Sequence, residues 1–344
     1  MTSQGEKLNL LVATYMEPEH IEKIRQVDDR LNVIYEPSLL PVPRFVGDHL
    51  GRPLTRTPDQ EKRWLELLAK ADIMLDFDKT HMKELPELAP RVRWIQSTST
   101  GIGQFVHDLG FDKRMPETVI TVAGVHARPL AEFTIMALLM HYKLVGLMQK
   151  QKQEKGFDRF TGTDAEGRTM AILGLGRNGA EAARMARAIG MNVLGMDLLP
   201  KSDVVDRFFK RDELNEMLAG AEVLVVAMPE TPLTKNMIGA SELSLLKKGA
   251  YLINISRGSI VDEAALIDAL RSGQLSGAAL DVFVKEPLPQ DSPLWDMENV
   301  LISPHAASIS DRENGRITEM FCDNLRRYLD GKPLRNVLNT ELLY

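Results

Sequence analysis

A glycine-rich turn between an apolar stretch and a helical segment is the clearest sign of ligand chemistry in this sequence. Gly174, Gly176 and Gly179 form a G-x-G-x-x-G pattern directly after the apolar residues 170–173. The first glycine of such a pattern permits a tight turn, the second lets the backbone approach a pyrophosphate, and the third lets helix and strand pack closely. The amides at the start of the helix attract an anion. The pattern therefore predicts a dinucleotide site.

Asp197 stands 18 residues beyond the last of these glycines, at the end of the next apolar stretch, 192–196. A carboxylate at this position accepts hydrogen bonds from the ribose hydroxyls of NAD, and it repels the ribose phosphate of NADP. Lys201 lies four positions further on and leaves some use of NADP open. We therefore expect NAD as the cofactor, with NADP less favoured.

Charged side chains also follow three later apolar stretches. Residues 250–255 lead to Arg257, residues 277–282 contain Asp281 and lead to Glu286, and residues 300–302 lead to His305. In an open parallel sheet, ligands bind at the carboxyl ends of the strands. We therefore expect these side chains to face the same crevice as the glycine turn.

From about residue 124 to residue 305, and on through the final helix, the chain resembles the D-isomer-specific 2-hydroxyacid dehydrogenase family. The resemblance rests on the glycine pattern together with PETPLT at 229–234, INISRG at 253–258, ALDVF at 279–283 and LISPHAA at 301–307. It implies an oxidoreductase that transfers a hydride between NAD(H) and a small D-2-hydroxy acid or 2-oxo acid. Within the family, a glyoxylate or hydroxypyruvate reductase is the activity we expect.

By this resemblance, the catalytic residues are Arg257, Glu286 and His305. Reduction of a 2-oxo acid needs a hydride at carbon, which the nicotinamide supplies, and a proton at oxygen. His305 suits the proton donor because imidazole titrates near neutral pH. Glu286 would pair with the imidazole and raise its pKa. Arg257 would hold the substrate carboxylate or polarise the carbonyl with its planar fork of donors.

The resemblance also assigns binding residues. The substrate carboxylate is expected to lie against the loop formed by Thr100, Gly101 and Ile102, and against Arg257 and His305. The cofactor is expected to contact the glycine turn and the ends of the later strands, through Gly174, Gly176, Arg177, Asn178, Gly179, Asp197, Met228, Pro229, Thr234, Ile255, Ser256, Arg257, Asp281, His305 and Ala307. No metal-binding residues are expected.

Apolar stretches and helical segments alternate along the chain, a pattern typical of parallel sheets covered by helices. We expect two doubly wound α/β domains. A Rossmann nucleotide-binding domain at 119–307 would be inserted into a flavodoxin-like substrate domain formed by 1–118 and 308–344. Residues 129–148 have apolar side chains at helical spacing and predict one long helix between the domains. The family is usually dimeric through this helix, so we expect a homodimer.

The alternation lapses between residues 37 and 58, where five prolines prevent a regular helix. This stretch predicts a long ordered loop, and a short helix is expected later, at 64–69. The loop carries Arg44, Arg52 and Arg56. One hypothesis is that an arginine here recognises a second anionic group on the substrate. The alternative is a solvated, proline-stiffened loop.

The sequence has 344 residues, with 42 basic and 48 acidic side chains, so its formal net charge is −6 with neutral histidine. A chain this acidic lacks the basic footprint of a general nucleic-acid binder. The single cysteine, Cys322, excludes an internal disulfide and fits a reducing compartment. The first residues lack the pattern of a secretory signal, and the longest apolar stretch is too short to span a bilayer. We expect a cytoplasmic protein with a small-molecule substrate and without nucleic-acid or membrane partners.

Three other activities stay open at this stage. One is a D-3-phosphoglycerate dehydrogenase without a regulatory domain, since few residues follow the last predicted helix. A formate dehydrogenase ranks low, because family members with that activity have glutamine at the position of Glu286. The third is a function without catalysis, that of an NAD-sensing corepressor-like binding protein that shares the fold. Turnover with NADH that is lost in His305→Ala would separate an enzyme from a sensor.

Overall fold

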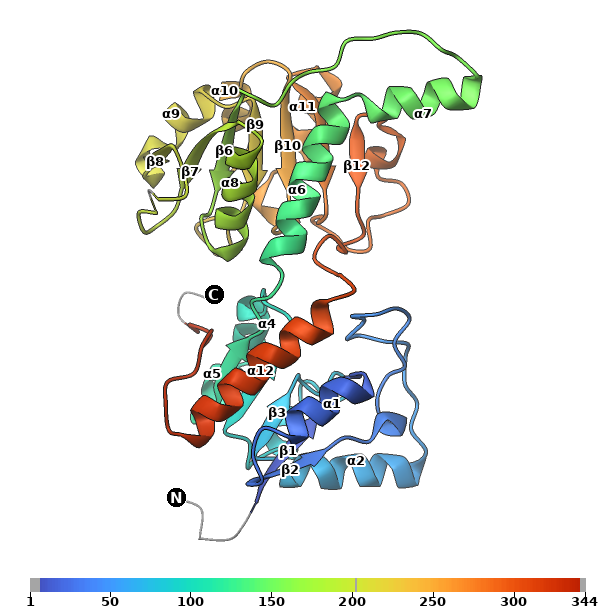
Figure 1. Ribbon diagram of the computed structural model, residues 1–344, viewed down its shortest axis with the longest axis vertical. Coiled ribbons are helices and arrows are strands. Elements are labelled where there is room, and N and C mark those ends of the chain that lie inside the picture. Colours follow the sequence, from blue (N-terminus) through green and yellow to red (C-terminus); the bar gives the residue numbers. More distant parts are fainter. Residues whose placement is uncertain (1–6, 202, 341–344) are drawn as a thin grey trace. The chain divides into compact units, whose positions relative to one another are not determined.

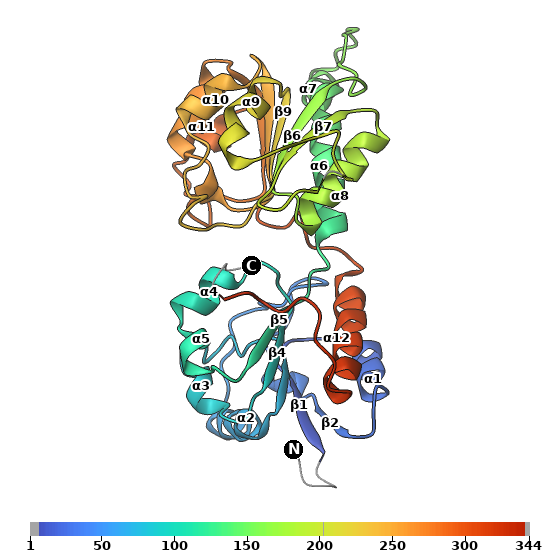
Figure 2. The ribbon, with the colours of Figure 1, turned by 90° about the vertical axis from the view of Figure 1, so that its left-hand side faces the viewer.

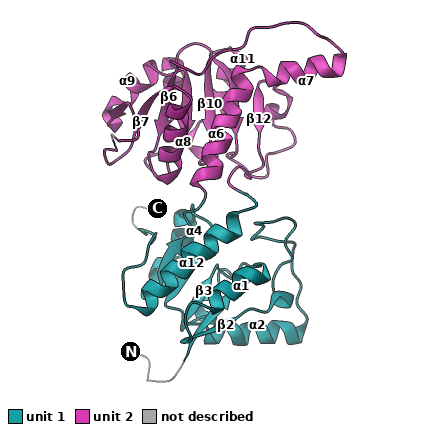
Figure 3. Ribbon diagram, in the orientation of Figure 1, with its two compact units in different colours: residues 1–125, 309–344 teal, residues 126–308 magenta. Residues whose placement is uncertain are grey.

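Every strand pairing within the two sheets of the described chain is parallel. The structure is a computed structural model that describes residues 7–201 and 203–340. It divides into two units, residues 1–125 with 309–344 and residues 126–308, and each unit contains one sheet (Figure 3). The expected α/β class with two doubly wound sheets is confirmed.

The first unit contains a five-stranded sheet with the order β2-β1-β3-β4-β5. This order, with the second strand at one edge, is that of flavodoxin-like folds. The strands are β1 (Leu8–Val12), β2 (Leu31–Ile34), β3 (Ile73–Leu75), β4 (Trp94–Ser97) and β5 (Val119–Val122). One face of the sheet is covered by α1 (Pro18–Arg25) and α12 (Glu313–Leu329) (Figure 2). The other face is covered by α2 (Pro58–Lys70), α3 (Leu85–Leu88), α4 (Gly103–Asp108) and α5 (Phe111–Arg114).

Helix α2 is longer than the sequence analysis predicted. Thr57 caps its first turn: the Thr57 side chain accepts a hydrogen bond from the amide of Gln60, and the Gln60 side chain accepts one from the amide of Thr57. Pro58 occupies the first helical position, where no amide donor is needed. Pro58, which the sequence predicts as the end of the preceding loop, therefore begins the helix.

The second unit contains a seven-stranded sheet with the order β12-β11-β10-β9-β6-β7-β8. The chain enters at β6 and builds outward on both sides, so the strand order reverses between β6 and β9, the position at which such sheets bind ligands. The strands are β6 (Thr169–Leu173), β7 (Asn192–Met196), β8 (Arg207–Phe209), β9 (Val223–Val226), β10 (Ala250–Asn254), β11 (Leu275–Leu280) and β12 (Val300–Ile302).

Helices cover both faces of this second sheet. Helices α6 (Ala127–Tyr142) and α8 (Arg177–Ala188) lie on one face (Figure 2). Helices α9 (Leu214–Ala219), α10 (Ala240–Leu245) and α11 (Glu263–Arg271) lie on the other. Successive strand residues point to opposite faces, so Ile172 packs with the first set of helices and Leu173 with the second. Burial on both faces explains why these strands are almost entirely apolar. Short 3₁₀ turns complete the fold at Pro37–Leu39, Arg211–Glu213, Gly258–Ile260 and Pro293–Asp296.

Two expectations about the middle of the chain are wrong. Strand β5, at 119–122, pairs with β4 in the first sheet, so the second unit begins at residue 126 and not at 119. The single helix expected at 129–148 is broken. Leu144 adopts a left-handed backbone conformation with φ of +55°, which ends α6 before α7 (Val145–Glu154) begins. Helix α7 buries none of its ten residues and projects from the rest of its unit (Figure 1).

No single helix in the described part of the chain is long and apolar enough to cross a membrane. Only α6 and α7 taken together reach the necessary length and composition, and they are bent by 57° at their junction.

Candidate active site

Three neighbouring strands of the second sheet carry the residues expected to do the chemistry. Strands β10, β11 and β12 lie side by side and run parallel, so their carboxyl ends share one edge of the sheet. Arg257 follows β10, Asp281 and Glu286 follow β11, and His305 follows β12. The fold thus brings Arg257 and His305, which lie 48 positions apart in sequence, to the same edge.

His305 and Glu286 form a hydrogen-bonded pair at this edge. Nδ1 of His305 lies 2.8 Å from Oε2 of Glu286, and the amide of Phe283 donates to Oε1 over 3.0 Å. The hydrogen bond with Glu286 raises the pKa of His305 and outweighs burial, which lowers it. Burial disfavours the charged form of Glu286, but the hydrogen bonds from His305 and Phe283 prevail and lower the pKa of the carboxyl. Because Nδ1 faces Glu286, Nε2 is the ring nitrogen that can serve a substrate.

Arg257 belongs electrostatically to the same group. Its positive charge favours the charged form of Glu286 and opposes protonation of His305, as the pKa shifts of both residues record. One guanidinium nitrogen, Nη1, donates to the carbonyl of Ser256 over 2.7 Å. A guanidinium presents a planar fork of donors that matches a carboxylate. The cluster therefore offers an anion-binding group beside a histidine that is held ready to donate a proton.

Asp281 holds the loop that carries His305. Its Oδ1 accepts hydrogen bonds from Oγ of Ser303 at 2.6 Å, the amide of Ala306 at 2.8 Å and the amide of Ala307 at 3.0 Å. The carboxylate is buried, with 2% of the residue exposed. His305 itself has a left-handed backbone with φ of +55°, a conformation that costs energy for a residue other than glycine. Asp281 is predicted to contact the cofactor, and its hydrogen bonds to the His305 loop are an additional structural role that the sequence does not indicate.

The three glycines of the turn after β6 differ in what the protein requires of them. Gly174 has φ of +90°, and an added Cβ there would lie 2.7 Å from the backbone nitrogen of Met228. An added Cβ at Gly179 would lie 1.8 Å from the carbonyl oxygen of Gly174. At Gly176 it would meet no heavy atom within 4 Å in the described part of the chain. Close packing therefore explains the glycines at 174 and 179. Of the three, only Gly176 leaves its backbone open to a ligand, and it lies next to Arg177 and Asn178 at the start of α8.

Asp197 follows β7 directly, beside this turn. Its Oδ2 accepts a hydrogen bond from the amide of Leu175, and its Oδ1 accepts one from the amide of Leu198, both at 2.7 Å. Nζ of Lys201 lies 3.7 Å from Oδ2 of Asp197 and donates to the carbonyl of Leu175 over 2.8 Å. Each carboxylate oxygen keeps a further lone pair for a ribose hydroxyl. The structure thus places a carboxylate and an ammonium together at the end of β7.

The remaining predicted cofactor residues line the loops after β9 and β10. Oγ1 of Thr234 donates to the carbonyl of Pro229 over 2.8 Å, which closes the first of these loops. Oγ of Ser256 donates to the carbonyl of Met228 and ties the second loop to the first. Together with Ile255, these residues lie at the same sheet edge as the glycine turn, because β10, β9 and β6 are parallel neighbours and the residues follow the carboxyl ends of β9 and β10.

The predicted substrate loop belongs to the first unit, where it follows β4. The amide of Ile102 donates to the carbonyl of Thr100 over 3.1 Å, and Oγ1 of Thr100 accepts from the amide of Gly124 at 3.3 Å. The side chain of Ile102 is buried in the core of this unit, whereas Gly101 is exposed. The loop can therefore present its backbone to a ligand, but not the side chain of Ile102.

A polar cluster that was not predicted lies at the carboxyl edge of the first sheet. Asp76 follows β3 directly with φ of +68°, and Nζ of Lys79 lies 2.8 Å from its Oδ2. Lys79 also donates to the carbonyl of His49 over 2.6 Å, and the His49 ring lies 3.0 Å from Oγ1 of Thr14. Polar residues just after two strands were the signal that could have found this cluster. Across the described residues, no group of three or more His, Cys, Asp or Glu side chains could hold a metal ion.

Two of the three arginines in the loop at 37–58 are engaged within the fold. Asp48 accepts hydrogen bonds from Nε and Nη2 of Arg44 at 2.7 and 3.0 Å. Arg56 donates to the carbonyl of Leu39 and lies over the ring of Trp64, 4.7 Å from its centroid. Arg52 is exposed. The geometry thus gives Arg44 and Arg56 structural partners, which weakens the hypothesis that they recognise a second anionic group.

Known proteins resemble this chain in sequence and in fold. The family described as D-isomer specific 2-hydroxyacid dehydrogenase, NAD binding domain, matches residues 135–307. A glyoxylate reductase from Korarchaeum cryptofilum is 33% identical over 267 residues, which cover 76% of this chain and 80% of that protein. A D-3-phosphoglycerate dehydrogenase from Methanocaldococcus jannaschii is 27% identical over 297 residues, which cover 85% of this chain but 56% of that protein.

Solved structures agree with these sequence matches. A D-isomer specific 2-hydroxyacid dehydrogenase from Xanthobacter autotrophicus Py2, crystallised with NADPH and MES, is 27% identical to this chain. The two structures align with a TM-score of 0.78 over 99% of this chain and 100% of that one.

Proposed function

This chain belongs to the D-isomer-specific 2-hydroxyacid dehydrogenase family, and from that premise we propose that it reduces glyoxylate, hydroxypyruvate or a similarly small 2-oxo acid with a nicotinamide cofactor. Family membership makes it an oxidoreductase that acts on CH–OH donors. The observation that carries the proposal is the hydrogen-bonded His305–Glu286 pair, next to the charge of Arg257, at the edge of a nucleotide-binding sheet. The curated relative named as a glyoxylate reductase supports the choice of substrate class.

We assign His305 as the proton donor to the substrate oxygen. Nε2 would donate, because Nδ1 is held by Glu286. The hydrogen bond with Glu286 raises the pKa of the imidazole, which favours its protonated form, and fixes its orientation. Arg257 would hold the substrate carboxylate with two donors of its guanidinium. When bound, the nicotinamide supplies the hydride for the carbonyl carbon. The His305 side chain is 45% exposed, so it can regain a proton from water after each turnover.

The turn after β6 fits a dinucleotide. Gly176 has open space where a side chain would stand, and the amides of α8 begin directly after it. We propose that Asp197 binds the ribose hydroxyls and makes NAD the preferred cofactor. Lys201, 3.7 Å from this carboxylate, would permit a weaker reaction with NADP. We further assign the backbone of Thr100 and Gly101 to the substrate carboxylate.

A panel of 2-oxo acids assayed with NADH and with NADPH tests this function. We expect the highest kcat/KM for glyoxylate or hydroxypyruvate with NADH, and loss of turnover in His305→Ala with NADH binding retained. Removal of a general acid typically costs about 10² to 10⁴ in rate. A preference for phosphohydroxypyruvate would instead indicate a D-3-phosphoglycerate dehydrogenase. Binding of NADH without turnover of any acid in the panel would refute the enzyme assignment and favour a sensor.

A further inference from the structure

The turn that carries Arg257 is fastened from inside by a buried asparagine. Asn254, the last residue of β10, is 2% exposed. Its Oδ1 accepts a hydrogen bond from the amide of Ser256 at 3.1 Å, and its Nδ2 donates to the carbonyl of Arg257 over 3.0 Å. The peptide group before Ser256 and the peptide group after Arg257 are thus held by one side chain, so the backbone segment that carries the arginine is fixed relative to the sheet.

The next residue, Gly258, lies directly against the loop that leads to Glu286. An added Cβ at Gly258 would lie 2.0 Å from the carbonyl carbon of Phe283, 2.3 Å from its oxygen and 2.4 Å from the nitrogen of Val284. All three atoms belong to backbone, so no side chain can rotate away to make room. The amide nitrogen of the same residue, Phe283, donates to Oε1 of Glu286. One backbone contact therefore joins the Arg257 turn to the support of Glu286.

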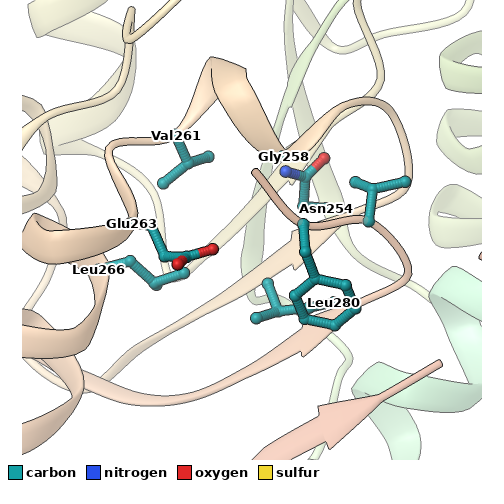
Figure 4. Close-up of a pocket in the computed structure, with 8 residues that line it drawn as sticks. Asn254, Gly258, Val261, Glu263, Leu266 and Leu280 are labelled. Atoms are coloured by element: carbon teal, nitrogen blue, oxygen red, sulfur yellow. The ribbon is translucent and has the colours of Figure 1, made fainter. Parts of the chain in front are cut away.

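A small cavity of about 10 Å³ beside this contact contains little free space. Asn254, Gly258 and Leu280 lie on one side of it, and Val261, Glu263 and Leu266 lie on the other (Figure 4). Phe283 also lines the cavity. A volume of this size holds about one water molecule. The turn and the loop are therefore closely packed against each other on this side.

We propose that Gly258 is a positioning residue that couples the Arg257 turn to the Glu286–His305 pair through its contact with the backbone of Phe283 and Val284. The proposal rests on the function proposed above, because it assumes that Arg257 and His305 act on one substrate. A methyl group at Gly258 would push the loop outward and lengthen the Glu286–His305 hydrogen bond. Anion binding by Arg257 and proton donation by His305 would then be impaired together.

The test compares Gly258→Ala with Gly277→Ala. Gly277 lies in β11 of the same unit, and an added Cβ there would lie 2.5 Å from the backbone oxygen of Asn299, so it is a similarly crowded control. We expect both variants to melt at lower temperature than the wild type. Only Gly258→Ala should lose roughly 10- to 100-fold in kcat/KM for the 2-oxo acid, since misplaced catalytic groups cost this much.

The pH profile separates positioning from simple destabilisation. The hydrogen bond with Glu286 raises the pKa of His305, so its loss should move the alkaline limb of kcat/KM to lower pH in Gly258→Ala and not in Gly277→Ala. Equal losses of activity in the two variants, with unchanged pH profiles, would overturn the proposal. If the wild type itself reduced no 2-oxo acid, the proposed function would fail first, and the two failures are thus distinguishable.

A second pair of variants covers the case in which Gly258→Ala does not fold. Asn254→Ala removes the clamp without adding bulk. Asn324→Ala is its control, because buried Asn324 also bonds backbone in both directions, accepting from the amide of Arg335 at 2.8 Å and donating to its carbonyl over 3.1 Å. We expect Asn254→Ala to raise the KM for the 2-oxo acid and to leave the Kd for NADH unchanged. Asn324→Ala should not raise this KM. A loss of stability in both variants without this KM effect would contradict the proposal.

Discussion

At the scale of single residues, the pH range of the reaction depends on the bond between Nδ1 of His305 and Oε2 of Glu286. The hydrogen bond with Glu286 raises the pKa of His305, so the proton donor stays charged to a higher pH than an ordinary imidazole does. Reduction should therefore be fully active below the ordinary titration range of imidazole and should fall as pH rises through the raised pKa. In Glu286→Gln the negative charge is gone, so we expect the alkaline limb of kcat/KM to move to lower pH.

Initial rates of 2-oxo acid reduction across a pH series would measure this shift. Glu61→Gln provides the control, because Oε1 of Glu61 also lies 2.8 Å from a histidine nitrogen, Nε2 of His81, in the first unit. That variant should keep the wild-type profile. If both variants shifted equally, the effect would reflect net charge rather than the bond to His305.

At the scale of elements, the junction of β6 and α8 separates a packing requirement from a binding requirement. In Gly179→Ala the new methyl group would overlap the carbonyl of Gly174, and such overpacking typically costs about 1–3 kcal/mol or more in the free energy of unfolding. In Gly176→Ala it would point into open space, so stability should stay close to that of the wild type.

The two glycine variants should therefore differ from the wild type in different properties, one in stability and the other in NADH binding. We expect Gly179→Ala to melt at a lower temperature without cofactor, and Gly176→Ala to melt normally but bind NADH more weakly, because the methyl group occupies the approach to the pyrophosphate. Thermal melts and fluorescence titration with NADH would give both values. Unimpaired NADH binding by Gly176→Ala would show that the turn is not a phosphate site.

At the scale of the whole molecule, α7 and the segment after it present apolar side chains that the unit does not bury. Phe157 is 99% exposed, and Leu147 and Met148 on α7 are also exposed. Large exposed apolar side chains that gather on one segment can mark an interaction surface. We propose that α7 and the segment around Phe157 bind a second copy of the chain, as expected for a homodimer.

Phe157→Asp should consequently shift the protein from dimer to monomer in analytical ultracentrifugation. Phe45→Asp is the matched control, since Phe45 is an exposed phenylalanine in a loop of the other unit. It should leave the sedimentation unchanged. A wild type that sediments as a monomer would refute the dimer.

Much of the second unit follows from the sequence because its local patterns are strong. The apolar stretches at 170–173, 192–196 and 300–302 became β6, β7 and β12 almost residue for residue. Short elements with weaker patterns, such as β8 and the helices α3, α4, α5, α9 and α10, were not predicted. Helix α6 was predicted to continue, since the break at Leu144 depends on backbone conformation and not on periodicity.

The sequence by itself determined which chemical groups stand at the ends of the strands, because parallel strands joined by helices always bring their carboxyl ends to one edge. Only the tertiary structure decided which atoms meet there. The bond of Glu286 to Nδ1 of His305, the three donors on Asp281 and the contact of Gly258 with Phe283 all join loops that are distant along the chain. Such contacts depend on how irregular segments pack against each other, and no periodic pattern in the sequence records that packing.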